Sequence, residues 1–204
     1  MLVNTKKGEG MKQHYFIAIP LSTKLEQCFD NQMSSWKKWL SFKNWVHPHD
    51  LHITLAFLGF ATSEQLDCIK EQLHASICNH QPFTLTLSNP GVFGREEFPR
   101  IFWMGVEHSD PLINLQKNVS EFLERNDFSL DKRPYCPHIT LARKWKNEQA
   151  FQLDKLNFSH IKPSLSWEVN DVVLYKTNMD LIPKYEPVYT WRLGELYSSL
   201  IDDN

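Results

Sequence analysis

The tetrapeptide His-Ile-Thr-Leu occurs twice in this chain, at residues 52–55 and 138–141, and an Ala follows it each time. A Phe stands 36 residues before each motif His, at positions 16 and 102, with a helical stripe of apolar residues between them. Two matching strand–helix–strand segments offset by 86 residues indicate an internal duplication. We therefore expect a pseudo-two-fold protein in which two equivalent strands meet at a shared site.

Each motif places one His and one Thr on the same face of its strand. Residues two apart share a face, so His52 and Thr54 point to one side, and His138 and Thr140 repeat this arrangement. Imidazoles with pKa values of about 6.5 act as general acid and base near neutral pH, and hydroxyls donate hydrogen bonds to oxyanions. The pattern predicts metal-free displacement at phosphorus, with a leaving group that needs a proton, such as a ribose hydroxyl.

The rest of the chain alternates between strand-like and helix-like segments, which predicts a mixed fold. Apolar runs and period-two alternation predict strands at residues 15–19, 51–58, 83–87, 101–106, 138–142, 169–176 and 188–193. Stripes with a 3.6-residue period predict helices at 23–40, 62–78 and 111–125, with a short helix at 147–157. Ser22 or Thr23 is the expected cap of the first helix, and Thr62 or Ser63 that of the second.

Composition narrows the class of protein. Of the 204 residues, 42% are hydrophobic and 23% charged, as in globular proteins, and no apolar run approaches the roughly 20 residues of a membrane span. The net charge of −2 gives no overall attraction to nucleic acid. Four cysteines without a CxxC pair favour free thiols in the cytoplasm. We expect a flexible leader at 1–10 and one monomeric domain at 11–204, with no obligate protein partner and no membrane association.

Two other chemistries would use the same histidines. His47, His49 and His52 are close enough in sequence for zinc ligands, but Pro48 stiffens the segment and no Asp/His cluster follows it. Cys136 lies two residues before His138, which is a spacing that a Cys–His nucleophile on one strand face could use. Because nothing else in the sequence supports either alternative, we expect no metal and no cofactor.

Paired His-x-Thr motifs in two pseudo-symmetric lobes resemble the 2H phosphoesterase superfamily. The contexts of the motifs, His52–Gly59 and Pro137–Arg143, are similar to its RNA 2',3'-cyclic phosphodiesterase branch, formerly labelled 2'-5' RNA ligase. Phe98–Val106 and Tyr15–Pro20 resemble two further strands of that branch. Together with the repeat, the resemblance implies a bilobal α+β fold, in which two antiparallel sheets flank a central cleft and helices cover the outer faces.

The resemblance also implies a reaction, the opening of an RNA 2',3'-cyclic phosphate to a 2'-phosphomonoester without a metal. Carried over by motif position, His52 protonates the departing 3'-oxygen, His138 activates water, and Thr54, Thr140 and Arg143 hold the phosphate. The expected partner is an RNA end or nucleotide that carries the cyclic phosphate, with reversal to 2'-5' ligation as a further expectation. Two alternatives stay open: a small-molecule cyclic phosphodiesterase acting on a nucleoside or ADP-ribose cyclic phosphate, and a binding module without turnover.

Two candidate substrate contacts conflict with simple strand geometry. Arg143 and Phe57 each lie five residues after a motif His, so an ideal strand would turn them toward the core. Each needs a bulge or a strand end to reach the site. Phe57 is the first candidate for stacking on a base and Tyr135 another, with Trp45 and Phe93 as further aromatic candidates.

The second motif is bracketed by basic residues. Residues 131–146 contain Lys132, Arg133, Arg143, Lys144 and Lys146 against a single acidic residue, Asp131. We expect a local basic patch beside the site, which an RNA end would use in an otherwise slightly acidic protein. Arg95 and Arg100, near the Phe93-Gly94 turn, are weaker phosphate candidates.

Overall fold

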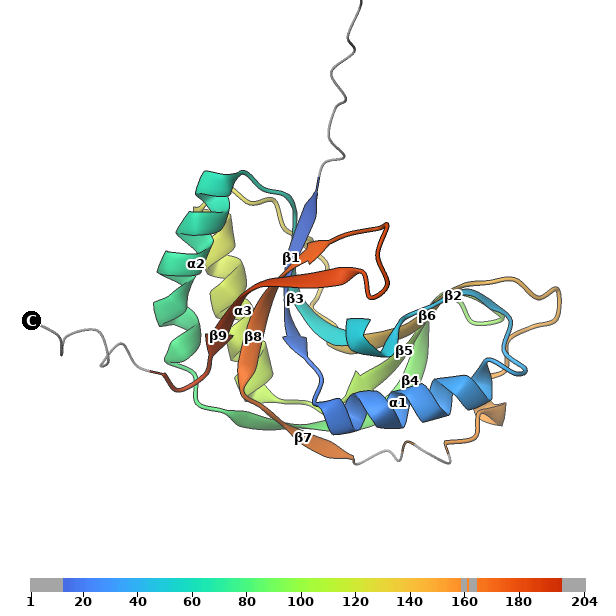
Figure 1. The fold of residues 1–204 in the computed structure, drawn as a ribbon. Coiled ribbons are helices and arrows are strands. Elements are labelled where there is room, and N and C mark those ends of the chain that lie inside the picture. The colour runs from blue at the N-terminus through green and yellow to red at the C-terminus, as the bar shows by residue number, and fades with distance from the viewer. Residues whose placement is uncertain (1–12, 159–160, 162–164, 196–204) are drawn as a thin grey trace, which may run out of the picture.

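The computed structural model describes residues 13–158, 161 and 165–195, and Figure 1 shows the order of their helices and strands. The strands are β1 (His14–Pro20), β2 (Phe42–Trp45), β3 (His52–Phe60), β4 (Phe83–Arg95), β5 (Phe98–Val106), β6 (His138–Trp145), β7 (Ser166–Val169), β8 (Asp171–Thr177) and β9 (Tyr185–Arg192). The helices are α1 (Thr23–Trp36), α2 (Ser63–Cys78) and α3 (Asp110–Arg125), with short 3-10 helices η1 (Pro48–Asp50) and η2 (Leu153–Lys155). The expected leader at 1–10 lies outside the described residues, and the single domain at 11–204 stays a prediction.

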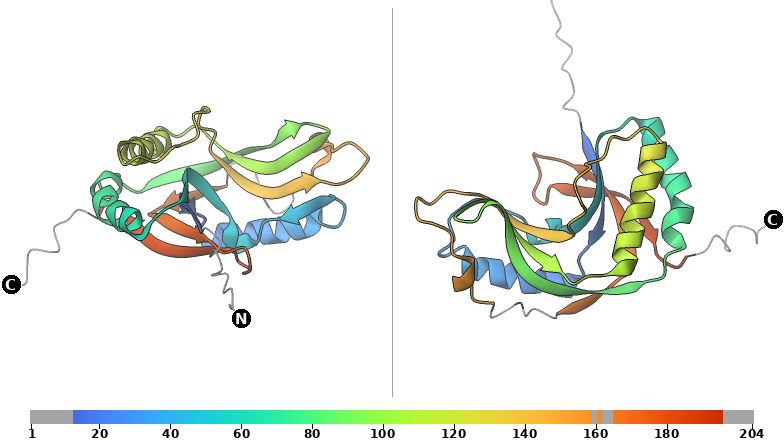
Figure 2. Two further views of the ribbon diagram at one scale, coloured as in Figure 1. Left: turned by 90° about the horizontal axis from the view of Figure 1, so that it is seen from above. Right: turned by 180° about the vertical axis from the view of Figure 1, so that it is seen from behind.

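The strands of the described residues form one continuous antiparallel sheet of nine strands, whose two halves, called the first and the second sheet, meet where β3 pairs with β6. The first sheet, in the order β3-β1-β8-β9, carries His52, and the second sheet, in the order β7-β4-β5-β6 with β2 on β6, carries His138. The two sheets join through a single register pair, Ile53 opposite Ile139 on β3 and β6. Figure 2 shows the sheets bending away from this junction with the helices on the outside. The predicted α+β fold with antiparallel sheets is confirmed.

The helix of each repeat packs on the sheet of the other repeat. Helix α1 follows β1 of the first sheet, yet the ring of Trp36 lies 5.4 Å from that of Phe102 on β5 of the second sheet. Helix α3 follows β5, yet the side-chain amide of Gln116 donates to the carbonyl of Leu55 on β3 at 3.4 Å. Helices α2 and α3 lie side by side over the first sheet (Figure 1). This exchange joins both halves in one hydrophobic core.

Side-chain caps begin all three helices near the predicted positions. The hydroxyl of Ser22 accepts from the N–H of Leu25 at 3.3 Å and begins α1. At α2, Thr62 and Gln65 form a capping box, in which each side chain accepts from the backbone N–H of the other. Such caps satisfy N–H groups that have no partner within the helix, so the helix starts are local properties of the sequence.

The predicted helix at 147–157 is wrong, because this segment forms only the short turn η2. Its backbone groups bond to other elements instead. The N–H of Phe151 donates to Glu97 at 2.8 Å, and the carbonyl of Asn157 accepts from the side chains of Gln32 and Trp36 on α1. The N–H of Phe151 is therefore unavailable for an intrahelical hydrogen bond, and the carbonyl of Asn157 ties the end of the segment to α1. The short strands β2 and β7 were not predicted, and β4 continues beyond the predicted end at residue 87.

A β-bulge occurs at the same place in both repeats. Leu55 on β3 and Leu141 on β6, each three residues after a motif His, are skipped in the pairing with the neighbouring strand. The register pairs that flank the bulges are Ile17–Ala56 and Ala18–Thr54 in the first sheet, and Phe102–Ala142 and Trp103–Thr140 in the second. One extra residue in a strand reverses the face of every residue beyond it.

The bulges also correct the repeat alignment drawn from the sequence. Ile17 and Phe102 occupy equivalent positions beside the bulges, so β1 and β5 correspond with an offset of 85 residues. The match of Phe16 with Phe102 is therefore wrong by one residue. Phe16 lies beside the ring of His52, whereas Phe102 faces the core against Trp36. The two motif strands keep the offset of 86.

Candidate active site

The junction of the two sheets gathers the four motif side chains. Ile53 and Ile139 are fully buried at the junction, and their neighbours His52, Thr54, His138 and Thr140 are half-buried on the opposite side of the strands. Because β3 and β6 run antiparallel, the His of one motif lies toward the Thr of the other. We call this side of β3 and β6 the motif face. It brings together the four residues that the sequence singled out.

Both imidazoles are held in the same orientation by the backbone. Nδ1 of His52 donates to the carbonyl of Asp50 at 2.7 Å, and Nδ1 of His138 donates to the carbonyl of Cys136 at 2.8 Å. A carbonyl only accepts, so each neutral ring has its proton on Nδ1 and its lone pair on Nε2. Nε2 of His52 lies 3.0 Å from the hydroxyl of Thr54, which donates to it. Each ring therefore offers Nε2 for proton transfer.

The surroundings of both histidines favour the neutral form. Burial lowers the pKa of His52 to about 4; the charges of Arg143 and His138 also lower it, while the Asp50 carbonyl and carboxylate raise it. Burial likewise lowers the pKa of His138, with the nearby Arg143 contributing in the same direction. Both rings are therefore proton acceptors near neutral pH until a negative charge enters the site.

The bulges turn Arg143 and Phe57 toward the motif face. The two consecutive buried residues before each of them, at 55–56 and 141–142, mark the change of face. The charge of Arg143 lowers the pKa of His52, His138 and Tyr185, as expected of a guanidinium on the motif face. The ring of Phe57 is 61% exposed and lies 5.5 Å from Phe16. The bulge required by the sequence reasoning is present in both halves.

Aromatic rings enclose the histidines, and the sequence reasoning did not assign most of them to the site. Phe16, Tyr175 and Tyr185 surround His52, with ring centroids 4.8, 6.3 and 5.2 Å away. Tyr175 and Tyr185 belong to β8 and β9, far along the chain from the motif, so no spacing rule finds them. Beside His138, the ring of Phe93 is 4.9 Å away and that of Trp103 is 6.0 Å away. Of these rings, Phe93 alone was among the sequence candidates.

Other predicted substrate contacts have structural partners. The hydroxyl of Tyr135 donates to the carbonyl of Thr54 at 3.1 Å, so it ties the loop before the second motif to the first motif strand. Lys37 lies over the ring of Trp45, 5.8 Å from its centroid. Arg95 lies over the ring of Phe98, 5.3 Å from its centroid.

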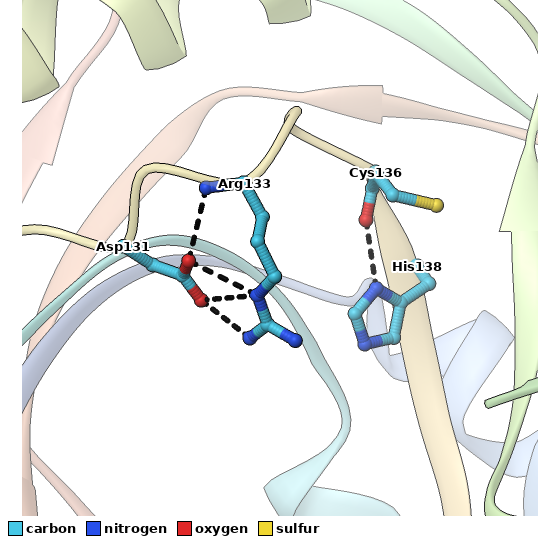
Figure 3. A network of polar contacts seen from close by, with 4 residues as sticks. All are labelled: Asp131, Arg133, Cys136 and His138. Carbon is cyan, nitrogen blue, oxygen red and sulfur yellow. Dashed lines mark hydrogen bonds and ion pairs between the residues drawn. The ribbon is translucent and has the colours of Figure 1, made fainter. Parts of the chain in front are cut away.

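The predicted basic patch at 131–146 is divided in the structure. Lys132 and Arg133 precede β6, whereas Lys144 and Lys146 lie at or beyond its other end, and a strand of eight residues spans roughly 25 Å. Arg133 is bound by Asp131 and lowers the pKa of that carboxyl to about 2. Figure 3 shows this pair beside His138. The expectation of a local basic patch beside the site therefore stays a prediction.

The two alternative chemistries are not assembled. His47 accepts from the N–H of His49, and Nδ1 of His49 lies 2.8 Å from a carboxylate oxygen of Glu26, so these rings do not converge with His52. Among the described residues, no group of three or more His, Cys, Asp or Glu could hold a metal ion. Figure 3 shows the Sγ of Cys136 pointing away from the imidazole of His138.

The family model described as the 2'-5' RNA ligase superfamily matches residues 29–181, which contain both motifs. The chain belongs to the 2'-5' RNA ligase superfamily. Within the described residues of this family member, no helix is long and apolar enough to cross a membrane.

Relatives in this superfamily share sequence along most of the chain. A protein from Geobacillus stearothermophilus named RNA 2',3'-cyclic phosphodiesterase is 41% identical over 182 residues, covering 89% of this chain and 58% of the relative. A protein of the same name from Bacillus subtilis (strain 168) is 31% identical over 188 residues, covering 90% of this chain and 98% of the relative. The chain thus spans little more than half of the first relative and nearly all of the second.

Solved structures of other proteins share the fold. The E. coli LigT structure complexed with 3'-AMP has a TM-score of 0.69 and 25% identity, and covers 90% of this chain and 99% of LigT. The protein TT0787 of Thermus thermophilus has a TM-score of 0.72 with 24% identity, and the match covers 89% of this chain and 98% of TT0787. The two-sheet architecture is therefore common to these proteins.

Proposed function

We propose that this chain hydrolyses RNA 2',3'-cyclic phosphate ends to 2'-phosphomonoesters by two-histidine acid–base catalysis, without a metal. The observation that carries the proposal is the equivalent placement of His52 and His138, each anchored through Nδ1 and offering Nε2 on one face. Superfamily membership and the names of the two relatives supply the substrate class.

The proposed roles follow from what each group can do. Nε2 of His138 takes a proton from water as its oxygen bonds to phosphorus, and His52, protonated, gives its proton to the 3'-oxygen as the P–O3' bond breaks. The hydroxyls of Thr54 and Thr140 donate to non-bridging oxygens, and Arg143 offers paired donors to the same group. Proton exchange with water after product release restores both rings.

The charge of the substrate has a part in this scheme. His52 is neutral near pH 7 in the free protein because burial lowers its pKa to about 4. A bound anionic phosphodiester favours the protonated imidazole and offsets the repulsion from Arg143. We therefore assign the proton-donating state of His52 to the substrate complex, and the choice of His52 as the acid is supported by the superfamily resemblance.

One observation favours the small-molecule alternative enough to require a test. The basic residues around the second motif lie toward the two ends of β6, so an RNA chain would have to follow a track along the strand to contact them all. A nucleoside 2',3'-cyclic phosphate would use the same His, Thr and Arg groups without needing such a track. Comparison of kcat/KM for an RNA oligonucleotide and for the mononucleotide decides between the two substrates.

We place the activity in the cytoplasm, with the cyclic-phosphate RNA end as the partner. The four cysteines at positions 28, 68, 78 and 136 are free, which suits a reducing compartment. Fractionation of cells producing the tagged protein tests the location.

The function is tested with an RNA oligonucleotide ending in a 2',3'-cyclic phosphate, in excess EDTA. The wild-type protein should form a 2'-phosphate, and His52→Ala and His138→Ala should each lower turnover by ~10²–10⁴. Full activity in either variant would contradict the two-histidine scheme. Activity abolished by EDTA would contradict metal independence, and retained binding without turnover would point to a binding module.

A further inference from the structure

Asp50 is a buried carboxylate that holds a distant part of the chain against the motif face. The residue is only 4% exposed to solvent. Both carboxylate oxygens accept from the N–H of Lys184 at 3.0 Å, and one also accepts from the N–H of Tyr185 at 3.0 Å. A buried charge is stable only when it is bonded in this way. Asp50 therefore fixes the connection between β8 and β9, more than 130 residues away in sequence.

The same residue also holds His52. The backbone carbonyl of Asp50 accepts from Nδ1 of His52 at 2.7 Å. Tyr185, which Asp50 anchors through its N–H, lies edge-on to the imidazole with ring centroids 5.2 Å apart. Asp50 thus reaches His52 by two routes, directly through its carbonyl and indirectly through Tyr185.

The second repeat has no counterpart of this carboxylate. The position equivalent to Asp50, two residues before the motif His, is Cys136. Its carbonyl holds His138 as the carbonyl of Asp50 holds His52. However, Cys136 is exposed and carries a thiol. Nδ1 of each histidine therefore bonds to a backbone carbonyl in the same way. The residue that supplies this carbonyl carries a carboxylate at His52 and a thiol at His138.

The groups that face His52 have opposing effects on its charge. They are Asp50 before β3, His138 and Arg143 on β6, Tyr175 on β8 and Tyr185 on β9. Arg143 and His138 oppose a proton on His52, and the two tyrosines are neutral because burial raises their pKa. Asp50 is the one carboxylate in this set, and it favours the protonated ring.

We infer that Asp50 is the positioning residue that makes the two equivalent histidines different, by aligning His52 and supporting a positive charge on it. This role deepens the proposed function, on which it rests for the identity of His52 as proton donor. The carboxylate lies in the half of the protein that contains His52, the histidine that must be protonated. The half that contains His138, the histidine that must be neutral, lacks it. The pseudo-symmetry of the acid and the base is thus broken by one residue outside both motifs.

The first test is independent of activity. Asp50→Asn keeps the shape and one acceptor oxygen but removes the charge, and Asp180→Asn removes an exposed carboxylate from the same β8–β9 connection as a control. In histidine Cε1 NMR titrations, Asp50→Asn should lower the pKa of His52 by about one unit while that of His138 stays unchanged. Asp180→Asn should leave both unchanged. Equal shifts of both histidines, or none, would overturn the inference.

Activity on the cyclic-phosphate RNA provides the second test. Asp50→Asn should lower kcat by ~10-fold or more with little change in KM, and it should move the high-pH limb of the kcat profile to lower pH. Asp50→Glu, which keeps the charge, should restore part of kcat. A uniform loss of kcat across the pH range, with no restoration by Glu, would reduce Asp50 to a structural role.

The two tests separate failure of this inference from failure of the proposed function. If the wild-type protein lacks activity, the titrations of the free protein still decide whether Asp50 distinguishes the two rings. Should Asp50→Asn fail to fold, Asp50→Ser provides a smaller neutral acceptor for the same titration. An unchanged pKa of His52 in that variant would also overturn the inference.

Discussion

Phe57 and Arg143 occupy equivalent positions in the two motif strands, five residues after the motif His, and a bulge turns each toward the motif face. The first half of the repeat thus offers an exposed aromatic ring at the place where the second offers a guanidinium. The duplicated scaffold thus presents two different candidate substrate contacts at matched positions. The contacts predict different consequences when each side chain is removed.

Arg143→Ala should lower kcat/KM by ~10²-fold, because the phosphate loses a charged donor group with paired N–H bonds. Arg143→Lys should recover only part of the loss, since an ammonium lacks the planar fork. Steady-state kinetics on the cyclic-phosphate RNA measure both variants. Arg125→Ala, at the end of α3 where the side chain bonds to the carbonyl of Glu121, is the control. Wild-type kinetics in Arg143→Ala would remove Arg143 from the site.

Phe57→Ala should raise KM by ~5-fold or more with kcat nearly unchanged, because stacking on a base contributes ~1–3 kcal/mol to binding. The ring is 61% exposed, so its loss should change the free energy of unfolding little. KM and urea unfolding are measured on the same preparations. Phe98→Ala, which also removes an exposed ring, should leave KM unchanged. An unaltered KM in Phe57→Ala would assign base contact to another ring.

Stability should fall on acidification from about pH 6.5 to pH 4. The pKa of His52 is lowered to about 4 by burial, so the unfolded chain binds more protons than the folded protein within this window. The full effect of His52 is roughly 3 kcal/mol, present above pH 6.5 and lost as pH falls. The lowered pKa of His138 acts in the same direction. Urea unfolding at several pH values measures the slope.

A histidine variant isolates the contribution of His52 to this slope. His52→Gln should flatten the dependence of the unfolding free energy on pH between 4 and 6.5. His108→Gln, which changes an exposed histidine paired with Asp110, should keep the wild-type slope. Identical slopes in wild type and His52→Gln would show that the folded protein does not lower the pKa of His52.

The salt dependence of RNA binding should be shallow. For single-stranded RNA the logarithm of affinity falls with the logarithm of salt by about 0.7 for each phosphate neutralised. One contact through Arg143 therefore gives a slope of about −0.7, whereas five contacts from the basic residues at 131–146 would give about −3.5. Titrations of a catalytically inactive His138→Ala variant with labelled RNA at increasing KCl measure it. A steep slope would show that several of the basic residues at 131–146 contact the RNA.

The limits of the sequence reasoning follow from the range of each interaction. Helix starts were predictable because caps such as Ser22 and Thr62 act within three residues. The motif faces were predictable from strand alternation, and the repeat indicated that both motifs meet. The positions of the bulges were not predictable, since alternation along an ideal strand turns Phe57 and Arg143 toward the core. Contacts such as Asp50 with Tyr185 depend on a strand pairing that no local pattern encodes.

Gly91→Ala should lower activity by moving Trp103 away from its place beside His138. A Cβ at Gly91 would lie 2.3 Å from the indole of Trp103, so the ring must shift. Such overpacking costs about 1–3 kcal/mol of stability. In NMR spectra the resonances of His138 should shift while those of His52 hold. Gly59→Ala, where a Cβ meets no atom within 4 Å but the backbone has φ +67°, should cost stability without moving His138. An unshifted His138 resonance in Gly91→Ala would show that Trp103 does not set the environment of that ring.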